Sequence, residues 1–148
     1  MNPQNKDKIL VKLKQAEEKI ETALWQAVKD SNHEVELQRY QEVKDYLLSL
    51  SGLPSEFTQE RDRILSYCLM RIDNALVELG DSTEAVNRAR EAFDVAQRSG
   101  NPIQIARCSL AYGTRLLNVG DLPAAESQFK LVYELAEKYP NDNDIQQT

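Results

Sequence analysis

The sequence of 148 residues predicts an all-α fold, a solenoid of about three stacked antiparallel helix pairs with a long N-terminal helix. Apolar residues recur at helical spacing along most of the chain. Glycine and proline are rare, with five of each, and aromatic residues make up only 7%. Two segments, 66–98 and 106–138, also match each other at an offset of 40 residues. The length suits one domain with its own core, so we expect a single unit over residues 1–148.

The repeat is carried by identical residues on apolar helix faces and at a turn. They are Cys68/Cys108, Leu76/Leu116, Gly80/Gly120, Asp81/Asp121, Ala85/Ala125 and Ala96/Ala136. We therefore expect two hairpins, over residues 56–100 and 102–140. The two cysteines would lie about one helix pair apart, too far for a disulfide, and are expected to be buried free thiols.

Each repeat has a Gly-Asp pair between its two predicted helices. Gly80 and Gly120 stand where a left-handed glycine ends a helix, and an aspartate or serine then caps the next one. The second helices carry small residues at helical spacing, among them Ala85, Ala89 and Ala125. These alanines are expected to be buried where a neighbouring helix approaches closely.

The N-terminal part predicts a degenerate hairpin over residues 5–51, made of one long helix over 5–30 and a second over 34–51. Six apolar residues of the first helix follow heptad spacing and form an apolar stripe: Ile9, Leu13, Ala16, Ile20, Ala23 and Ala27. Four further apolar residues widen this stripe: Leu10, Leu24, Trp25 and Val28. The inward residues expected of the second are Val35, Leu37, Tyr40, Val43, Leu47 and Leu48. The long helix either caps the first hairpin or pairs with another chain. In the hairpin over residues 56–100, either the first helix is longer than that of the following hairpin, or a short ordered segment, SEFTQE, precedes it.

Both repeats resemble tetratricopeptide (TPR) repeats. Gly113, Gly120, Asp121, Ala125 and Phe129 match the signature of that family, and a proline at position 140 resembles its closing proline, displaced by two residues. The upstream copy has an aspartate at position 73 instead of the glycine and an alanine at position 89 instead of the aromatic residue. The 40-residue period is similar to a longer-helix variety in bacterial regulators and light-chain-type adaptors, which also links repeats with a segment like VAQRSGNP at 95–102.

This resemblance implies a non-enzymatic interaction module, a scaffold or adaptor that binds a peptide or helix of another protein. In TPR stacks the first helices line a concave face, and registration on the turn predicts the partner-binding residues there: Tyr67, Met70, Asn74, Glu78, Arg107, Leu110, Thr114 and Asn118. Met70 and Leu110 stand where a carboxylate clamp for chaperone tails would need lysines.

The alternative function is a regulatory or structural homo-oligomer assembled through terminal helices. The segment YPNDNDIQQT at 139–148 carries turn and cap residues that could begin another helix, and we otherwise expect residues 141–148 to form a polar tail. A stack that stops at the helix over 123–139 leaves the apolar face of that helix exposed. Phe129 is expected to face its own hairpin, which leaves Val132 and Tyr133 as the possible association face.

Composition and motifs disfavour several other classes. The net charge is −6, and residues 31–148 carry 12 Lys and Arg against 19 Asp and Glu, which repels nucleic acid. No apolar run reaches the roughly 20 residues that span a bilayer, and no apolar signal segment stands at the N-terminus, so we expect a cytoplasmic protein. His33 is the only histidine, and no metal-binding, phosphate-binding or nucleophile motif is present. We expect no enzymatic activity and no cofactor.

Overall fold

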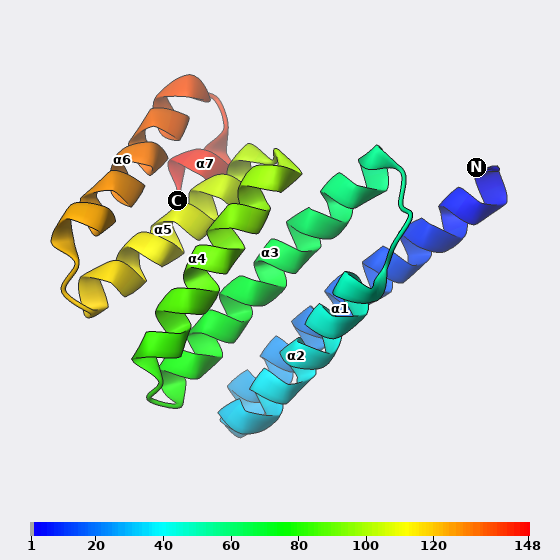
Figure 1. Ribbon diagram of the computed structural model, residues 1–148, viewed down its shortest axis with the longest axis horizontal. Coiled ribbons are helices and arrows are strands. Elements are labelled where there is room, and N and C mark those ends of the chain that lie inside the picture. The colour runs from blue at the N-terminus through cyan, green and yellow to red at the C-terminus, as the bar shows by residue number, and fades with distance from the viewer. Residues whose placement is uncertain (1) are drawn as a thin grey trace.

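The computed structural model describes residues 2–148, which form seven α-helices and no strands (Figure 1). The helices are α1 (Pro3–Asp30), α2 (His33–Ser49), α3 (Ser55–Glu78), α4 (Ser82–Ser99), α5 (Pro102–Asn118), α6 (Leu122–Lys138) and α7 (Asn143–Gln146). Helices that follow each other in sequence pack as pairs, so the predicted all-α stack of helical hairpins is confirmed. Within the same residues, every helix is too short or too polar to cross a lipid bilayer.

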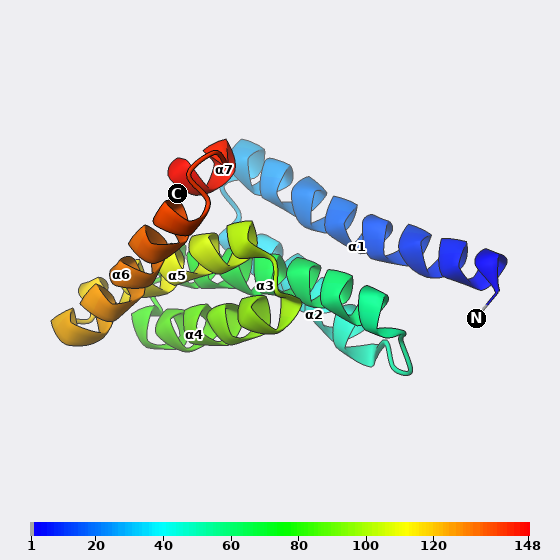
Figure 2. The same cartoon turned by 90° about the horizontal axis from the view of Figure 1, so that it is seen from above.

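The first helices of the three pairs, α1, α3 and α5, run parallel to one another. Arg63 and Tyr67 of α3 contact Glu17 and Glu21 of α1, a constant offset of 46 residues. Between α3 and α5 the offset is 42, as the hydrogen bond between Asp73 and Arg115 shows. Seen from above in Figure 2, α1 and α7 rise on either side of α3 and α5. These four helices therefore enclose one concave side of the stack.

The Gly-Asp pairs form the turns that the sequence predicts. Gly80 and Gly120 have φ of 84° and 83°, the left-handed conformation that closes α3 and α5. The side chain of Asp81 then accepts a hydrogen bond from the amide of Glu84, which caps α4. Asp121 caps α6 in the same way. Both repeats thus start their second helix with the same local chemistry.

The core lies where these repeated residues meet. Ala85, Ala89 and Ala125 are buried, as the sequence predicts. Cys68 and Cys108 are free and buried, also as predicted. Small buried side chains of this kind let neighbouring helices approach closely, as dense packing of a protein interior requires.

The N-terminal hairpin matches the prediction on its inner side only. Leu13, Ala16, Ile20, Ala23 and Ala27 are buried, and α1 packs on α2 and α3 as the cap of the first hairpin. The expectation that Leu10, Trp25 and Val28 widen this buried stripe is wrong, since all three are exposed, and so is the inward placement of Val35 and Leu48. The reason is geometric, because an end hairpin has neighbours on one side only.

The first helix of the next hairpin is the longer of the two alternatives. The segment SEFTQE at 55–60 forms the start of α3 rather than a separate ordered segment. Phe57 anchors this extension because its side chain is buried in the main core. As a result α3 is long enough to contact α1, α2, α4 and α5.

The C-terminal end corrects one expectation. Residues 141–148 do not form a tail without contacts, because they include α7, which packs on α5 and α6. Ile145 is buried there, and the side-chain amide of Gln146 donates to the carbonyls of Ala136 and Tyr139 at 2.7 and 3.1 Å. The last helix of the third pair is thus covered near its C-terminal end.

Candidate binding groove on the concave face

A groove of about 490 Å³ lies between α3, α5 and α7 on the concave side. It contains five of the eight partner-binding residues that the sequence predicts. Its lining is made of Met70, Asn74, Arg107, Leu110, Ala111, Thr114, Arg115, Asp144, Gln147 and Thr148. The groove thus combines apolar side chains with hydrogen-bonding and charged groups, the mixture typical of surfaces that bind polypeptide segments.

The predicted residues inside the groove differ in what they offer a ligand. Met70 and Leu110 are half-buried and supply apolar surface, whereas Arg107 and Thr114 are exposed. The side-chain carbonyl of Asn74 accepts a 2.6 Å hydrogen bond from the Arg115 guanidinium. Its amide group therefore remains available to donate to a ligand, while its carbonyl is already occupied.

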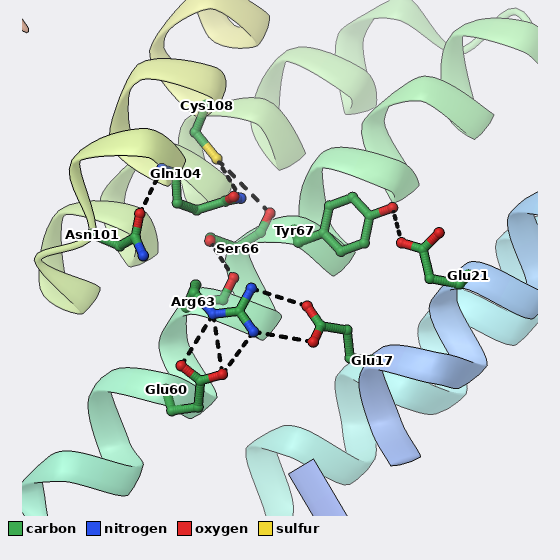
Figure 3. A network of polar contacts seen from close by, with 9 residues as sticks. All are labelled: Glu17, Glu21, Glu60, Arg63, Ser66, Tyr67, Asn101, Gln104 and Cys108. Carbon is green, nitrogen blue, oxygen red and sulfur yellow. Dashed lines mark hydrogen bonds and ion pairs between the residues drawn. The ribbon is translucent and has the colours of Figure 1, made fainter. Parts of the chain in front are cut away.

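Three predicted residues lie outside the groove, and one of them joins two helices. The hydroxyl of Tyr67 donates a 2.5 Å hydrogen bond to Glu21 of α1 (Figure 3), and the guanidinium of Arg71 lies 5.3 Å from the centre of its ring. Burial raises the pKa of Tyr67, so the phenol stays protonated as a donor. Glu78 is exposed beside His33 at the start of α2, and Asn118 is exposed at the end of α5.

A second contact between α1 and α3 lies one helical turn from Tyr67. Arg63 is held between Glu17 of α1 at 2.9 Å and Glu60 of α3 at 2.7 Å (Figure 3). The hydrogen bonds that the guanidinium donates to these carboxylates, that to Glu60 above all, raise the pKa of Arg63. Because Arg63, Glu17 and Glu60 are partly exposed, this network adds little to stability but fixes how α1 sits beside α3.

Asp73 lies behind the groove lining, in contact with the lining residue Arg115. Its carboxylate is fully buried and accepts a hydrogen bond from Nε of Arg115, which fixes α5 against α3. The other carboxylate oxygen has no hydrogen-bond partner. Burial, opposed by Arg115, raises the pKa of Asp73 to about 6. In the sequence alone, Asp73 is visible only as a departure from the glycine of the repeat.

Two exposed residues of α1 extend the concave surface and were missed as site residues. Trp25 and Val28 lie one and two turns after Glu21 on the same helix face, and they are 68% and 65% exposed. The offset of 46 aligns Val28 with Asn74. The 40-residue repeat does not reveal this alignment. The turn and cap residues of the segment at 139–148 indicated the start of another helix, but not its contribution to this groove.

A larger groove, of about 680 Å³, lies between α1 and α2 but has a different origin. Its α1 wall includes Lys19, Thr22 and Gln26, which the offset of 46 aligns with Leu65, Cys68 and Ile72 of α3. Polar residues on α1 thus replace the buried core residues of α3. The α1 wall of this groove is therefore more polar than the equivalent face of α3, while Val35, Val43 and Tyr46 of α2 keep the opposite wall apolar. We place the candidate site on the concave side because that groove contains five of the predicted residues.

The remaining groups give no second candidate. Burial raises the pKa of both Cys68 and Cys108 to about 12, which keeps the thiols protonated and unreactive. In the part of the chain that the structure describes, no three His, Cys, Asp or Glu side chains are grouped to hold a metal ion. Searches of protein-family models, curated proteins and solved structures found no match to this chain.

Proposed function

We propose that this protein is a non-enzymatic interaction module that binds a peptide or helix of another protein in the groove between α3, α5 and α7. The observation that carries the proposal is the pairing of Met70 and Leu110, two half-buried apolar residues on neighbouring parallel helices. They give a bound segment an apolar base, with the polar groups of Asn74, Arg107 and Thr114 beside it. The resemblance of the repeats to TPR repeats supports the same function.

The rigidity of the groove supports this proposal further. Asp73 and Arg115 fix α5 to α3 below it, while Arg63 and Tyr67 fix α3 to α1. A surface that is already in place loses little conformational entropy when a ligand binds, and this favours affinity. The exposed guanidinium of Arg107 further favours segments that place an acidic residue next to an apolar one.

Selection from a random peptide library tests the proposal directly. Peptides selected on the full chain should lose roughly tenfold or more in affinity when Leu110 or Met70 is changed to Asp, because a charge then occupies the apolar base. The matched control is Leu48→Asp, on the exposed side of α2. Calorimetry gives the affinities. Selected peptides that bind both groove variants as tightly as the parent would contradict the proposal.

A further inference from the structure

The outer edge of α6 carries an exposed stripe of five residues. Leu122, Glu126, Lys130, Tyr133 and Glu137 are all exposed, and their spacing of four, four, three and four residues keeps them on one side of the helix. Leu122 and Tyr133 are 61% and 74% exposed, the two highest values among the large hydrophobic residues of the last hairpin. We call this set the α6 stripe. Two exposed apolar residues thus stand on either side of a pair of opposite charges, Glu126 and Lys130, on one face of the helix.

The repeat explains why Tyr133 is uncovered. The equivalent residue 40 positions earlier is Phe93 of α4, which is buried and packs on Tyr112 of α5 with ring centres 6.1 Å apart. Tyr133 therefore occupies a position that the next helix covers inside the stack. Figure 1 shows α6 at the outer side of the stack, with α7 over the end where α6 terminates. The α6 stripe remains open beside it.

The predicted association face is only partly this surface. Val132 is half-buried, and Phe129 lies against Gly113 of its own hairpin, as the sequence predicts. Val132 is therefore less available to a partner than expected, whereas Tyr133 points outward. The apolar surface that α6 offers to a partner is better described by Leu122 and Tyr133.

The α6 stripe is complementary to itself when two copies run antiparallel. A twofold axis at the level of Ser127 and Gln128 places Leu122 of one copy opposite Tyr133 of the other. The same axis places Glu126 opposite Lys130, so one arrangement gives two apolar contacts and two ion pairs. Glu126 and Lys130 take part in no ion pair among residues 2–148, which leaves both free for a second copy.

From this pattern we infer that two copies of the chain associate through the α6 stripe as a twofold antiparallel pair. Leu122 packs on Tyr133 and Glu126 pairs with Lys130 across the interface, each twice. The concave groove opens on α3, α5 and α7, so the pair keeps two grooves free and binds a partner protein bivalently.

Sedimentation equilibrium over a wide range of protein concentration tests the inference. The average mass should rise from the 16.9 kDa of one chain toward twice that value and no further. Tyr133→Ser and Leu122→Ser should each weaken association roughly tenfold or more without loss of helical circular dichroism. Leu48→Ser, a control at a residue that is 53% exposed on α2, should leave the mass profile unchanged.

A charge swap distinguishes the twofold arrangement from any other contact. Glu126→Lys and Lys130→Glu should each associate weakly alone, because each places like charges opposite one another. An equal mixture of these two variants should associate as well as the parent, since every cross-pair is then attractive. Mixing cannot restore charge pairs within one helix, so recovery must come from the interface. A chain that stays monomeric at roughly 1 mM, or a mixture that does not recover, overturns the inference.

Discussion

Gly113 of α5 lies directly against the ring of Phe129 of α6, and a Cβ atom at position 113 would stand 2.7 Å from Cε1 of that ring. The two helices of the third hairpin meet at this contact. The equivalent positions in the second hairpin hold Asp73 and Ala89, both buried. The two repeats therefore place different residues at the same two positions. Only the second hairpin places a carboxylate there.

The contact makes Gly113→Ala destabilising although alanine is the better helix former. Alanine gains about 1 kcal/mol from helix propensity, but forcing the ring aside costs roughly 1–3 kcal/mol. In a Phe129→Leu background the clash is absent, and the same substitution should stabilise the fold. Urea unfolding of the four proteins in this cycle gives both values. A loss of equal size in both backgrounds would contradict the contact.

The turns predict a second stability effect. Gly120→Ala should cost about 1 kcal/mol or more, because alanine is strained at a φ of 83°. The cost is conformational, since a Cβ at this position meets no atom within 4 Å. Gly120→Asn is the matched control and should cost less, because asparagine tolerates the left-handed conformation. Equal losses for the two variants, measured by thermal unfolding, would argue against this cause.

The fold was predictable where local chemistry repeats. Gly80 and Gly120 set the turns through their backbone conformation. Alanines at helical spacing mark the buried side of the second helices. Both the turns and this buried side can therefore be predicted from the sequence alone. The end elements were not predictable in this way. α7 has four residues, too few for periodicity, and it forms because Ile145 finds a site between α5 and α6. Val35 and Leu48 look like core residues in sequence, but no neighbouring helix covers them.

The candidate site was predictable in part for the same reason. Registration on the turns located Met70, Leu110 and other groove residues, because α3 and α5 belong to the recognisable repeat. Trp25 depends on an offset of 46 between α1 and α3, which tertiary packing sets and the repeat length does not. The contact between Asp73 and Arg115 joins residues of different repeats, and no local sequence pattern predicts it.

Asp73 predicts an unusual dependence of stability on pH. Its pKa in the folded state is about 6, above the ordinary value of 3.8, so the folded protein holds this proton over a range where the unfolded chain has lost it. The contribution of Asp73 to stability is therefore present below about pH 4 and is lost as pH rises through about 6. Relative to Asp73→Asn, the parent should lose up to about 3 kcal/mol between pH 4 and 7.

This comparison is made by urea unfolding of the two proteins at each pH. Subtracting the variant from the parent removes the titration of the other carboxylates, which both proteins share. A difference that instead favours the parent as pH rises would show that the ion pair with Arg115 outweighs burial. The pKa of Asp73 would then be lowered, not raised.

The two thiols predict slow modification in the native state. Cys68 and Cys108 are buried, and burial raises the pKa of each to about 12, so thiolate is scarce at pH 8. Reaction with a disulfide reagent should be much slower than for the unfolded chain and should accelerate in urea as the stack opens. Cys68→Ser should leave one slow thiol. A native thiol that reacts as fast as the unfolded chain would contradict this burial.

The most direct test of the proposed function is a map of amide chemical-shift changes when a library-selected peptide is added to the full chain. The account predicts that the largest changes cluster at Met70, Asn74, Arg107, Leu110 and Thr114, with smaller ones in α7. Amides on the polar side of the α1 and α2 hairpin, such as those of Thr22 and Arg39, should remain unchanged. Changes that cluster between α1 and α2, with none between α3 and α5, would contradict the assignment of the concave groove as the binding site.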